Sequence, residues 1–378
     1  MHPTPPKRLA FIDNLRVMLI MLVVAHHAAQ PYGPTGGEWP IFNPERAPVL
    51  GPFFAVNAAF FMGLFFFISG YFLPAAYDRK GVKLFLKSRF KRLGIPLLFF
   101  ALVVFPPVLY KLAAPPVSFL AFFTQVYINQ LEIEVAHLWF LMHLLFYALV
   151  YALWRKVSLP VSPPPGLDRQ VPSQAAMLAY LVGLTAVTFI VRIDYPIDRW
   201  VNIFGFLPAE VAHLPQYSSL FVLGIMAYRH HWLERMATSQ GFTWLGIGLG
   251  AALLRYAYSL NRDRLALPDA IEGGGLSWQS LIWSGWEATI CMGLCIGLLI
   301  LFREKINFQG NRLRILADNV YMVYLIHLLW VIYLQFTIAS LSIGPFAKFG
   351  LVTLMGIPIS FAFSSLLRRL PWVKAIVF

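Results

Sequence analysis

The sequence predicts an all-α protein, a polytopic membrane bundle of about ten transmembrane helices with both termini in the cytoplasm. Hydrophobic residues make up 59% of the 378 residues and charged residues only 12%, whereas about 25% of residues are charged in a soluble domain. Several apolar stretches reach the roughly 20 residues that a helix needs to cross a hydrocarbon core of about 30 Å. Lysine and arginine are concentrated on alternate connections, which the positive-inside rule places in the cytoplasm. The net charge of +13 therefore reflects topology, and we expect no nucleic-acid partner.

The expected spans are separated by segments that are polar or broken by proline and glycine. They are residues 10–30, 53–73, 94–113, 135–155, 175–192, 214–231, 241–258, 278–302, 316–337 and 349–367. Residues 31–52 are expected to form an external loop over the outer mouth of the bundle. Residues 156–174 are Pro-rich and are expected to form a flexible cytoplasmic linker. Because no stretch indicates a soluble domain, residues 1–378 are expected to form one integral-membrane domain.

The first span carries four ionisable residues, although charge inside a membrane is costly and usually faces a bundle interior or a wet cavity. Arg16 and His27 are eleven residues apart, so on an α-helix they share one face, about 20° apart around the axis and about 16 Å apart along it. Asp13 joins this face, whereas His26 points about 80° away from Arg16. The face therefore offers a cation near the cytoplasmic end and an imidazole near the outer end.

A strongly basic segment precedes the third span. Its seven cations are Arg79, Lys80, Lys83, Lys87, Arg89, Lys91 and Arg92. One interpretation is the positive-inside rule together with binding of anionic lipid headgroups. The other is that Arg89 and Arg92, three residues apart, bind a multiply phosphorylated ligand, because guanidinium groups form paired hydrogen bonds with phosphate oxygens. Composition alone favours neither.

Four further polar residues lie in or beside spans. Glu134 and His137 are three residues apart at the entry to the fourth span and are close enough in sequence to touch. Glu287 lies inside the eighth span, where it is either a site residue or the partner of an internal cation. His327 lies inside the ninth span, where an interhelical hydrogen bond is favoured over a chemical role.

No pattern in the sequence indicates a metal site or a disulfide framework. Cys291 and Cys295 are one helical turn apart and are expected to be reduced packing residues. The adjacent histidines of the first span lack the HExxH spacing of a zinc helix.

Six motifs occur in order along the chain. They are Arg16 and His27 with ten residues between them after FIDNLRV, FFFISGYFL, Arg89 and Arg92 as RxxR before LGIP, HLWFLMHLL, QYSSLFVLGIMAY, and VYMVYLIHL. In these motifs the chain resembles membrane acyltransferase family three, particularly the branch that includes glucan-succinylating and polysaccharide O-acetylating proteins. The resemblance covers essentially the whole chain.

The resemblance implies a multi-pass enzyme of the bacterial cytoplasmic (inner) membrane. Such an enzyme moves an acyl group, here acetyl or succinyl, from cytoplasmic acyl-CoA to a hydroxyl, commonly on a carbohydrate or lipid-linked glycan of the cell envelope. It also implies that His27 is the catalytic imidazole and that Arg16, Arg89 and Arg92 hold the donor. Acyl-CoA is then a co-substrate, with no tightly bound cofactor, and membrane lipids are further partners.

The first span fits this chemistry, because a coenzyme A tail can extend over the roughly 16 Å between Arg16 and His27. Imidazole, whose ordinary pKa is about 6.5, accepts protons near neutral pH. Neutral His27 would deprotonate the acceptor hydroxyl, with Asp13 or an external carboxylate such as Glu134 orienting polar partners. A covalent acyl-histidine relay is the alternative, and the sequence does not distinguish the two mechanisms.

A proton-coupled secondary transporter is the second functional hypothesis, with Asp13, Arg16, His27 and Glu287 as relay residues. It gives no reason for the paired arginines before the third span. A non-catalytic scaffold is the third hypothesis, but it would make the internal charges needlessly costly. The sequence does not identify the acyl group, the acceptor or the oligomeric state.

Overall fold

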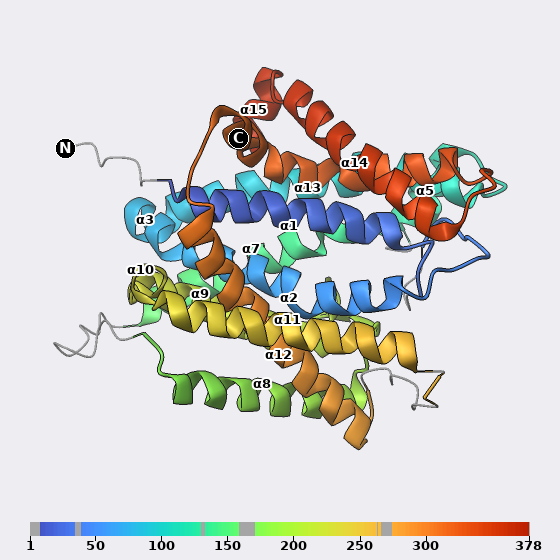
Figure 1. Ribbon diagram of the computed structural model, residues 1–378. Coiled ribbons are helices and arrows are strands. Elements are labelled where there is room, and N and C mark those ends of the chain that lie inside the picture. The colour runs from blue at the N-terminus through green and yellow to red at the C-terminus, as the bar shows by residue number, and fades with distance from the viewer. Residues whose placement is uncertain are drawn as a thin grey trace. The chain divides into compact units, whose positions relative to one another are not determined.

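The computed structural model describes residues 8–34, 39–129, 133–158, 171–262, 264–265 and 274–377. Nearly all of its regular structure is helical (Figure 1). Eight helices within these ranges are long and apolar enough to cross a membrane, which confirms the predicted all-α membrane bundle. The two other expected spans coincide with a helix of 16 residues and with a longer helix, α9 and α11. The count of ten spans and the cytoplasmic termini stay predictions.

The chain forms two compact units, each of which combines separate stretches of sequence. The first contains Met1–Pro74, Pro163–Val201 and Glu210–Ser364, and the second contains Ala75–Ser162, Asn202–Ala209 and Ser365–Phe378. The helices of the first unit are α1 (Ala10–Ala29), α2 (Leu50–Tyr71), α8 (Gln174–Asp194), a 3₁₀ turn (Val211–His213), α9 (Leu214–Arg229), α10 (Trp232–Arg235), α11 (Thr238–Asn261), α12 (Trp278–Lys305), α13 (Asn311–Thr337) and most of α14 (Pro345–Leu367).

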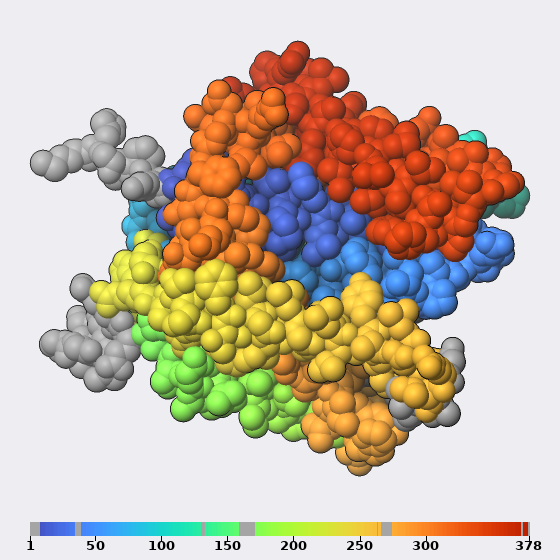
Figure 2. Space-filling view, in the orientation of Figure 1, coloured from blue at the N-terminus to red at the C-terminus, as the bar shows by residue number. Residues whose placement is uncertain are grey.

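In the first unit α1 lies beside α13 and also contacts α2 and α12 (Figure 1). Its buried residues include Ile12, Leu15, Leu19 and Val23, which recur at the three- and four-residue spacing of one helical face. In Figure 2 part of α1 (dark blue) is visible between segments of the C-terminal third of the chain (orange and red). The helix is therefore central to this unit without being fully covered.

Helices α2 and α9 approach closely because glycine stands at their crossing. A Cβ atom at Gly70 would lie 2.1 Å from the carbonyl oxygen of Phe221, and one at Gly224 would lie 2.1 Å from that of Phe67. Small residues allow such backbone contact, which is a common way for membrane helices to pack.

The second unit is built on a long helical stretch that prolines interrupt. Its helices are most of α3 (Leu73–Arg89), π-helical turns at Phe90–Gly94, Phe100–Val104 and Phe122–Ile128, α4 (Ile95–Phe99), α5 (Phe105–Ala113), α6 (Phe119–Ala121), a 3₁₀ turn (Ala136–Leu138), α7 (Trp139–Val157) and α15 (Pro371–Val377). The first two π-helical turns end two residues before a proline, at Pro96 and Pro106. A proline lacks the N–H of a normal helical turn and clashes with the carbonyl four residues earlier, so the backbone widens there.

The structure differs in two places from the segments expected from the sequence, and a third expected segment lies mostly outside the described residues. Helix α2 begins at Leu50, so the external loop expected at residues 31–52 is slightly shorter. Most of the linker expected at residues 156–174 lies outside the described residues. A β-hairpin that the sequence did not predict, β1 (Trp200–Ile203) and β2 (Leu207–Glu210), follows α8.

Candidate active site

Helix α1 carries the central residues of the candidate site. It is one α-helix from Ala10 to Ala29, so Arg16 and His27 share a face and lie about 16 Å apart along the axis at 1.5 Å per residue. Asp13 lies one turn before Arg16, with its Oδ1 atom 3.9 Å from Arg16 Nη1. A cation and an imidazole thus stand near opposite ends of one helix face.

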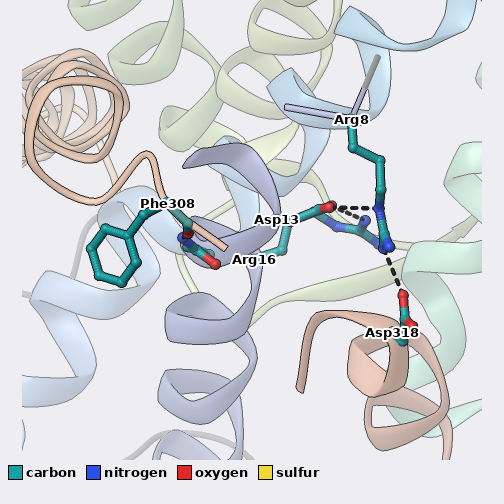
Figure 3. A network of polar contacts seen from close by, with 6 residues as sticks. Arg8, Asp13, Arg16, Phe308 and Asp318 are labelled. Carbon is teal, nitrogen blue, oxygen red and sulfur yellow. Dashed lines mark hydrogen bonds and ion pairs between the residues drawn. The ribbon is translucent and has the colours of Figure 1, made fainter. Parts of the chain in front are cut away.

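Arg16 belongs to a network of charges at the start of α1 (Figure 3). Arg8 Nε lies 3.0 Å from Asp13 Oδ2, and Arg8 Nη2 lies 2.6 Å from Asp318 Oδ1 on α13. Asp13 therefore lies between the guanidinium groups of Arg8 and Arg16. Because all four side chains are partly exposed, these pairs contribute little to stability.

The same end of α1 is tied to the end of α12. The amide nitrogen of Asn14 donates hydrogen bonds of 2.8 Å to the carbonyl oxygens of Ile306 and Phe308, just after α12 ends at Lys305. Carbonyls at a helix C-terminus lack partners within the helix. Asn14 satisfies them and fixes the start of α1 against this connection.

His27 contacts a second histidine at the other end of α1. His327 is 0% exposed, and its Nε2 atom lies 3.1 Å from His27 Nδ1. The His27 Nδ1 atom also lies 3.0 Å from the carbonyl oxygen of Val23, and His327 Nδ1 lies 2.8 Å from that of Tyr324. The interhelical hydrogen bond expected for His327 therefore runs directly to the proposed catalytic imidazole.

Trp39 and Gln335 complete the surroundings of His27. The indole ring of Trp39 stacks on the His27 ring with centroids 5.9 Å apart and an interplanar angle of 24°. Its Nε1 atom donates a 2.9 Å hydrogen bond to Gln335 Oε1. Gln335 Nε2 donates to the carbonyl oxygens of His27 (3.0 Å) and Ala28 (3.2 Å). One buried glutamine thus fixes both the stacking indole and the backbone of His27.

His26 points to a different side of α1, as the helix geometry predicts, although its ring centroid lies 5.9 Å from that of His27. Its ring packs against Phe53, Phe54 and Phe61 of α2, with centroid distances of 6.3, 5.0 and 5.1 Å. The two adjacent histidines therefore have different environments: polar for His27 and aromatic for His26.

A buried lysine lies close to the Trp39 and Gln335 segments. Lys348 on α14 is 6% exposed, and its Nζ atom donates to Asn43 Oδ1 (3.2 Å) and to the carbonyl oxygen of Ala339 (2.9 Å). Both acceptors are neutral. Within the described ranges no carboxylate forms an ion pair with this ammonium group.

Glu287 forms ion pairs with two cations of the first unit, Arg192 and His213. Its Oε2 atom lies 2.5 Å from Nη1 of Arg192, which is 0% exposed, and its Oε1 atom lies 2.6 Å from His213 Nε2. His213 Nδ1 in turn lies 2.9 Å from Glu210 Oε2. Of the two interpretations of Glu287, these contacts fit the partner of an internal cation; its role in a relay stays a prediction.

His213, at the N-terminal end of α9, is held in its charged form. Burial disfavours the imidazolium, but the carboxylates of Glu210 and Glu287 outweigh this and raise the pKa of His213 to about 10. Glu210 also accepts a 2.8 Å hydrogen bond from the backbone N–H of Asp198. The alternating charges join α8, α9 and α12 by electrostatic attraction.

The paired arginines of the RxxR motif lie in the second unit. Arg89 ends α3, with its guanidinium carbon 5.3 Å from the centroid of the Phe85 ring, and Arg92 follows in the π-helical turn. Arg79, Arg89 and Arg92 all lie close enough to Lys80 to repel it electrostatically. This concentration of positive charge is suited to bind a polyanion. All four cations belong to the second unit.

Glu134 and His137 also belong to the second unit. The Glu134 carboxylate accepts a hydrogen bond from the backbone N–H of Ala136, which is a local turn contact. His137 is buried, with its ring against Phe105 at a centroid distance of 6.3 Å. Their roles as supporting residues stay predictions.

Several residues of this site are not singled out by the sequence, among them Gln335, Lys348 and Arg192. Gln335 and Lys348 are polar residues in otherwise apolar helical stretches, and Arg192 ends an expected span. Gln335 and Arg192 could have been found by the rule that a polar group inside a span needs a partner, whereas Lys348 lies one residue before the span expected at residues 349–367. The partner itself could not be found, because it lies on another helix.

The comparisons with known proteins identify the family of the chain. Residues 9–365 match the acyltransferase-domain family, so the chain belongs to membrane acyltransferase family three. With its long apolar helices it is a multi-pass membrane acyltransferase. The resemblance drawn from the sequence motifs is confirmed.

Its curated relatives include proteins named "Glucans biosynthesis protein C" from Salmonella paratyphi B and Salmonella enteritidis PT4. Each is 27% identical over 373 residues, which covers 94% of this chain and 91% of the relative. No solved structure matches the chain.

The charge on His213 gives a pH dependence of stability. Because its pKa is raised from 6.5 to about 10, its ion pairs contribute stability that is complete below pH about 6.5 and is lost as the pH rises through about 10. In His213→Gln we expect a lower melting temperature at pH 7 and a difference from the wild type that shrinks toward pH 10. Thermal unfolding in nanodiscs measures this, and a constant difference across the pH range would contradict it.

Proposed function

We propose that the protein transfers an acyl group from cytoplasmic acyl-CoA to a hydroxyl of a cell-envelope glycan at the bacterial inner membrane. The observation that carries this proposal is the placement of Arg16 and His27 on one face of a single helix, about 16 Å apart. A cation at that distance suits the phosphates of coenzyme A when the thioester lies at the imidazole. The glucan acceptor is supported by the name of the Salmonella relatives.

In the proposed reaction His27 acts as the general base. The imidazole takes the proton of the acceptor hydroxyl while the hydroxyl oxygen attacks the thioester carbonyl carbon. The new C–O bond forms, the C–S bond breaks, and the coenzyme A thiolate leaves and takes the proton from the imidazolium. In the alternative route the acyl group is first transferred to His27 and then to the hydroxyl. The overall substrates and products are the same.

Donor binding is assigned to arginines at the predicted cytoplasmic side. Arg16 is oriented by Asp13, and Arg89 and Arg92 supply two guanidinium groups in a strongly positive segment. Guanidinium groups suit phosphate oxygens because they donate paired hydrogen bonds in a planar geometry. This assignment explains the basic residues that a transporter would leave without a role.

Of the two candidate acyl groups, the surroundings of Lys348 favour succinyl. A buried ammonium group is costly unless a negative charge compensates it, and the described acceptors of Lys348 are neutral. The acceptor Asn43 comes four residues after Trp39, and the acceptor Ala339 comes four residues after Gln335. Trp39 and Gln335 are the residues that hold His27. The carboxylate of a succinyl thioester directed outward from His27 would place a negative charge beside this ammonium group, whereas acetyl would not.

The proposed function is tested with purified protein in nanodiscs, labelled acyl-CoA and a glucan acceptor. His27→Asn should lower acyl transfer by about 10²–10⁴-fold, the usual contribution of a general base, while the protein stays folded. His26→Asn, at the neighbouring position with a different environment, is the matched control and should retain most activity. If the wild type transfers the acyl group and His27→Asn does so at the same rate, His27 is not the general base. If the wild type transfers no acyl group, the proposed acyltransferase activity is wrong.

The RxxR motif is tested by donor affinity. In the double variant Arg89→Ala with Arg92→Ala we expect the affinity for acyl-CoA to fall by at least about tenfold, because hydrogen bonds to charged groups are worth about 1.5–3 kcal/mol each. Lys87→Ala with Lys91→Ala removes the same charge from the same segment and serves as the control. Equal effects of the two double variants would assign the arginines to topology or lipid binding.

Acyl selectivity tests the role of Lys348. Lys348→Met should lower kcat/KM for succinyl-CoA by about tenfold or more, since a charge-assisted contact is worth at least about 1.5 kcal/mol, and should leave acetyl transfer little changed. Lys348→Arg keeps the charge and should retain part of the preference. Parallel losses with both donors would refute a role in acyl recognition.

A further inference from the structure

Two imidazoles from different helices share one hydrogen bond in the first unit. His27 Nδ1 on α1 and His327 Nε2 on α13 are 3.1 Å apart, and the ring centroids are 5.0 Å apart. We infer that His327 is a positioning residue that holds His27 in the tautomer protonated at Nδ1, so that Nε2 is the atom that accepts the hydroxyl proton. The catalytic part of this inference rests on the proposed function.

The surroundings of His327 determine where its own proton lies. Its Nδ1 atom lies 2.8 Å from the carbonyl oxygen of Tyr324 and 3.2 Å from that of Val323. Carbonyl oxygens only accept hydrogen bonds, so Nδ1 carries the proton. A neutral imidazole has one N–H, and a charged one would be costly at this fully buried position. His327 Nε2 therefore presents a lone pair toward His27.

His27 Nδ1 then faces two acceptors. One is His327 Nε2, and the other is the carbonyl oxygen of Val23 at 3.0 Å. A proton on Nδ1 is shared between both in a three-centre hydrogen bond. The opposite tautomer would direct a lone pair at two other lone pairs. With the proton on Nδ1, the basic lone pair of neutral His27 lies on Nε2.

The ring is held from more than one side. Trp39 stacks on its face, and Gln335 binds both the indole and the backbone carbonyl of His27. When Nε2 takes the hydroxyl proton, Nδ1–H stays in place and its hydrogen bond to His327 strengthens as the ring becomes charged. His327 accepts this hydrogen bond throughout and neither gains nor loses a proton, so proton transfer occurs at Nε2 alone.

The test combines a direct measurement of the tautomer with kinetics. Nitrogen-15 NMR of histidine-labelled protein in nanodiscs, with the His27 signals identified by their loss in His27→Asn, should show Nδ1–H in the wild type. His327→Phe keeps a ring but removes the acceptor, so His27 should become a mixture of tautomers. In the same variant kcat should fall by about 10²-fold with KM for acyl-CoA nearly unchanged.

Two further variants separate positioning from simple structural damage. His327→Gln offers an amide oxygen to Nδ1–H and should restore part of both the tautomer and kcat. His26→Phe is the matched control and should change neither. An Nε2–H signal for His27 in the wild type, or an unchanged tautomer and kcat in His327→Phe, would overturn the inference even where acyl transfer is intact. Absence of acyl transfer in the wild type would instead overturn the proposed function, and the tautomer would still be decided by NMR.

Discussion

A charged or polar side chain in an apolar helix bundle must find its partner within the protein, because the lipid offers none. This constraint organises the first unit. Glu287 meets both Arg192 and His213 within ion-pair distance, and His327 donates to backbone carbonyls of its own helix while it faces His27. These contacts join α1 to α13 and α12 to α8 and α9. The polar groups therefore specify which helices pack together as well as what the site can do.

Two of the polar clusters described in the first unit differ in the way their groups are satisfied. The cluster around Glu287 alternates positive and negative charge, so each charge is compensated by its neighbours. The cluster around His27 consists of neutral donors and acceptors, which include the side chains of Trp39 and Gln335. A compensated set of charges is suited to hold helices in place. A neutral imidazole with an oriented proton is suited to acid–base chemistry.

Much of the candidate site could be predicted from local sequence. The spacing of Arg16 and His27 places them on one face of any regular helix, and α1 is such a helix. The different environment of His26 follows from the same geometry. Glu287 and His327 were recognised as costly residues inside spans, but the sequence left two interpretations open for each. The structure adds the neighbouring side chains of Glu287 and His327, which the sequence does not identify.

The sequence by itself determined the membrane class, most of the helical segments, the family and the face of α1 that carries Arg16 and His27. These depend on composition, on the length of apolar stretches and on helical periodicity, all of which are local properties of the chain. Only the tertiary structure decided that His327 faces His27 and that Lys348 lies buried among neutral acceptors. The contacts of His27 with His327 and of Asn43 with Lys348 join residues 300 and 305 positions apart. They follow from the packing of whole helices, which no local pattern encodes.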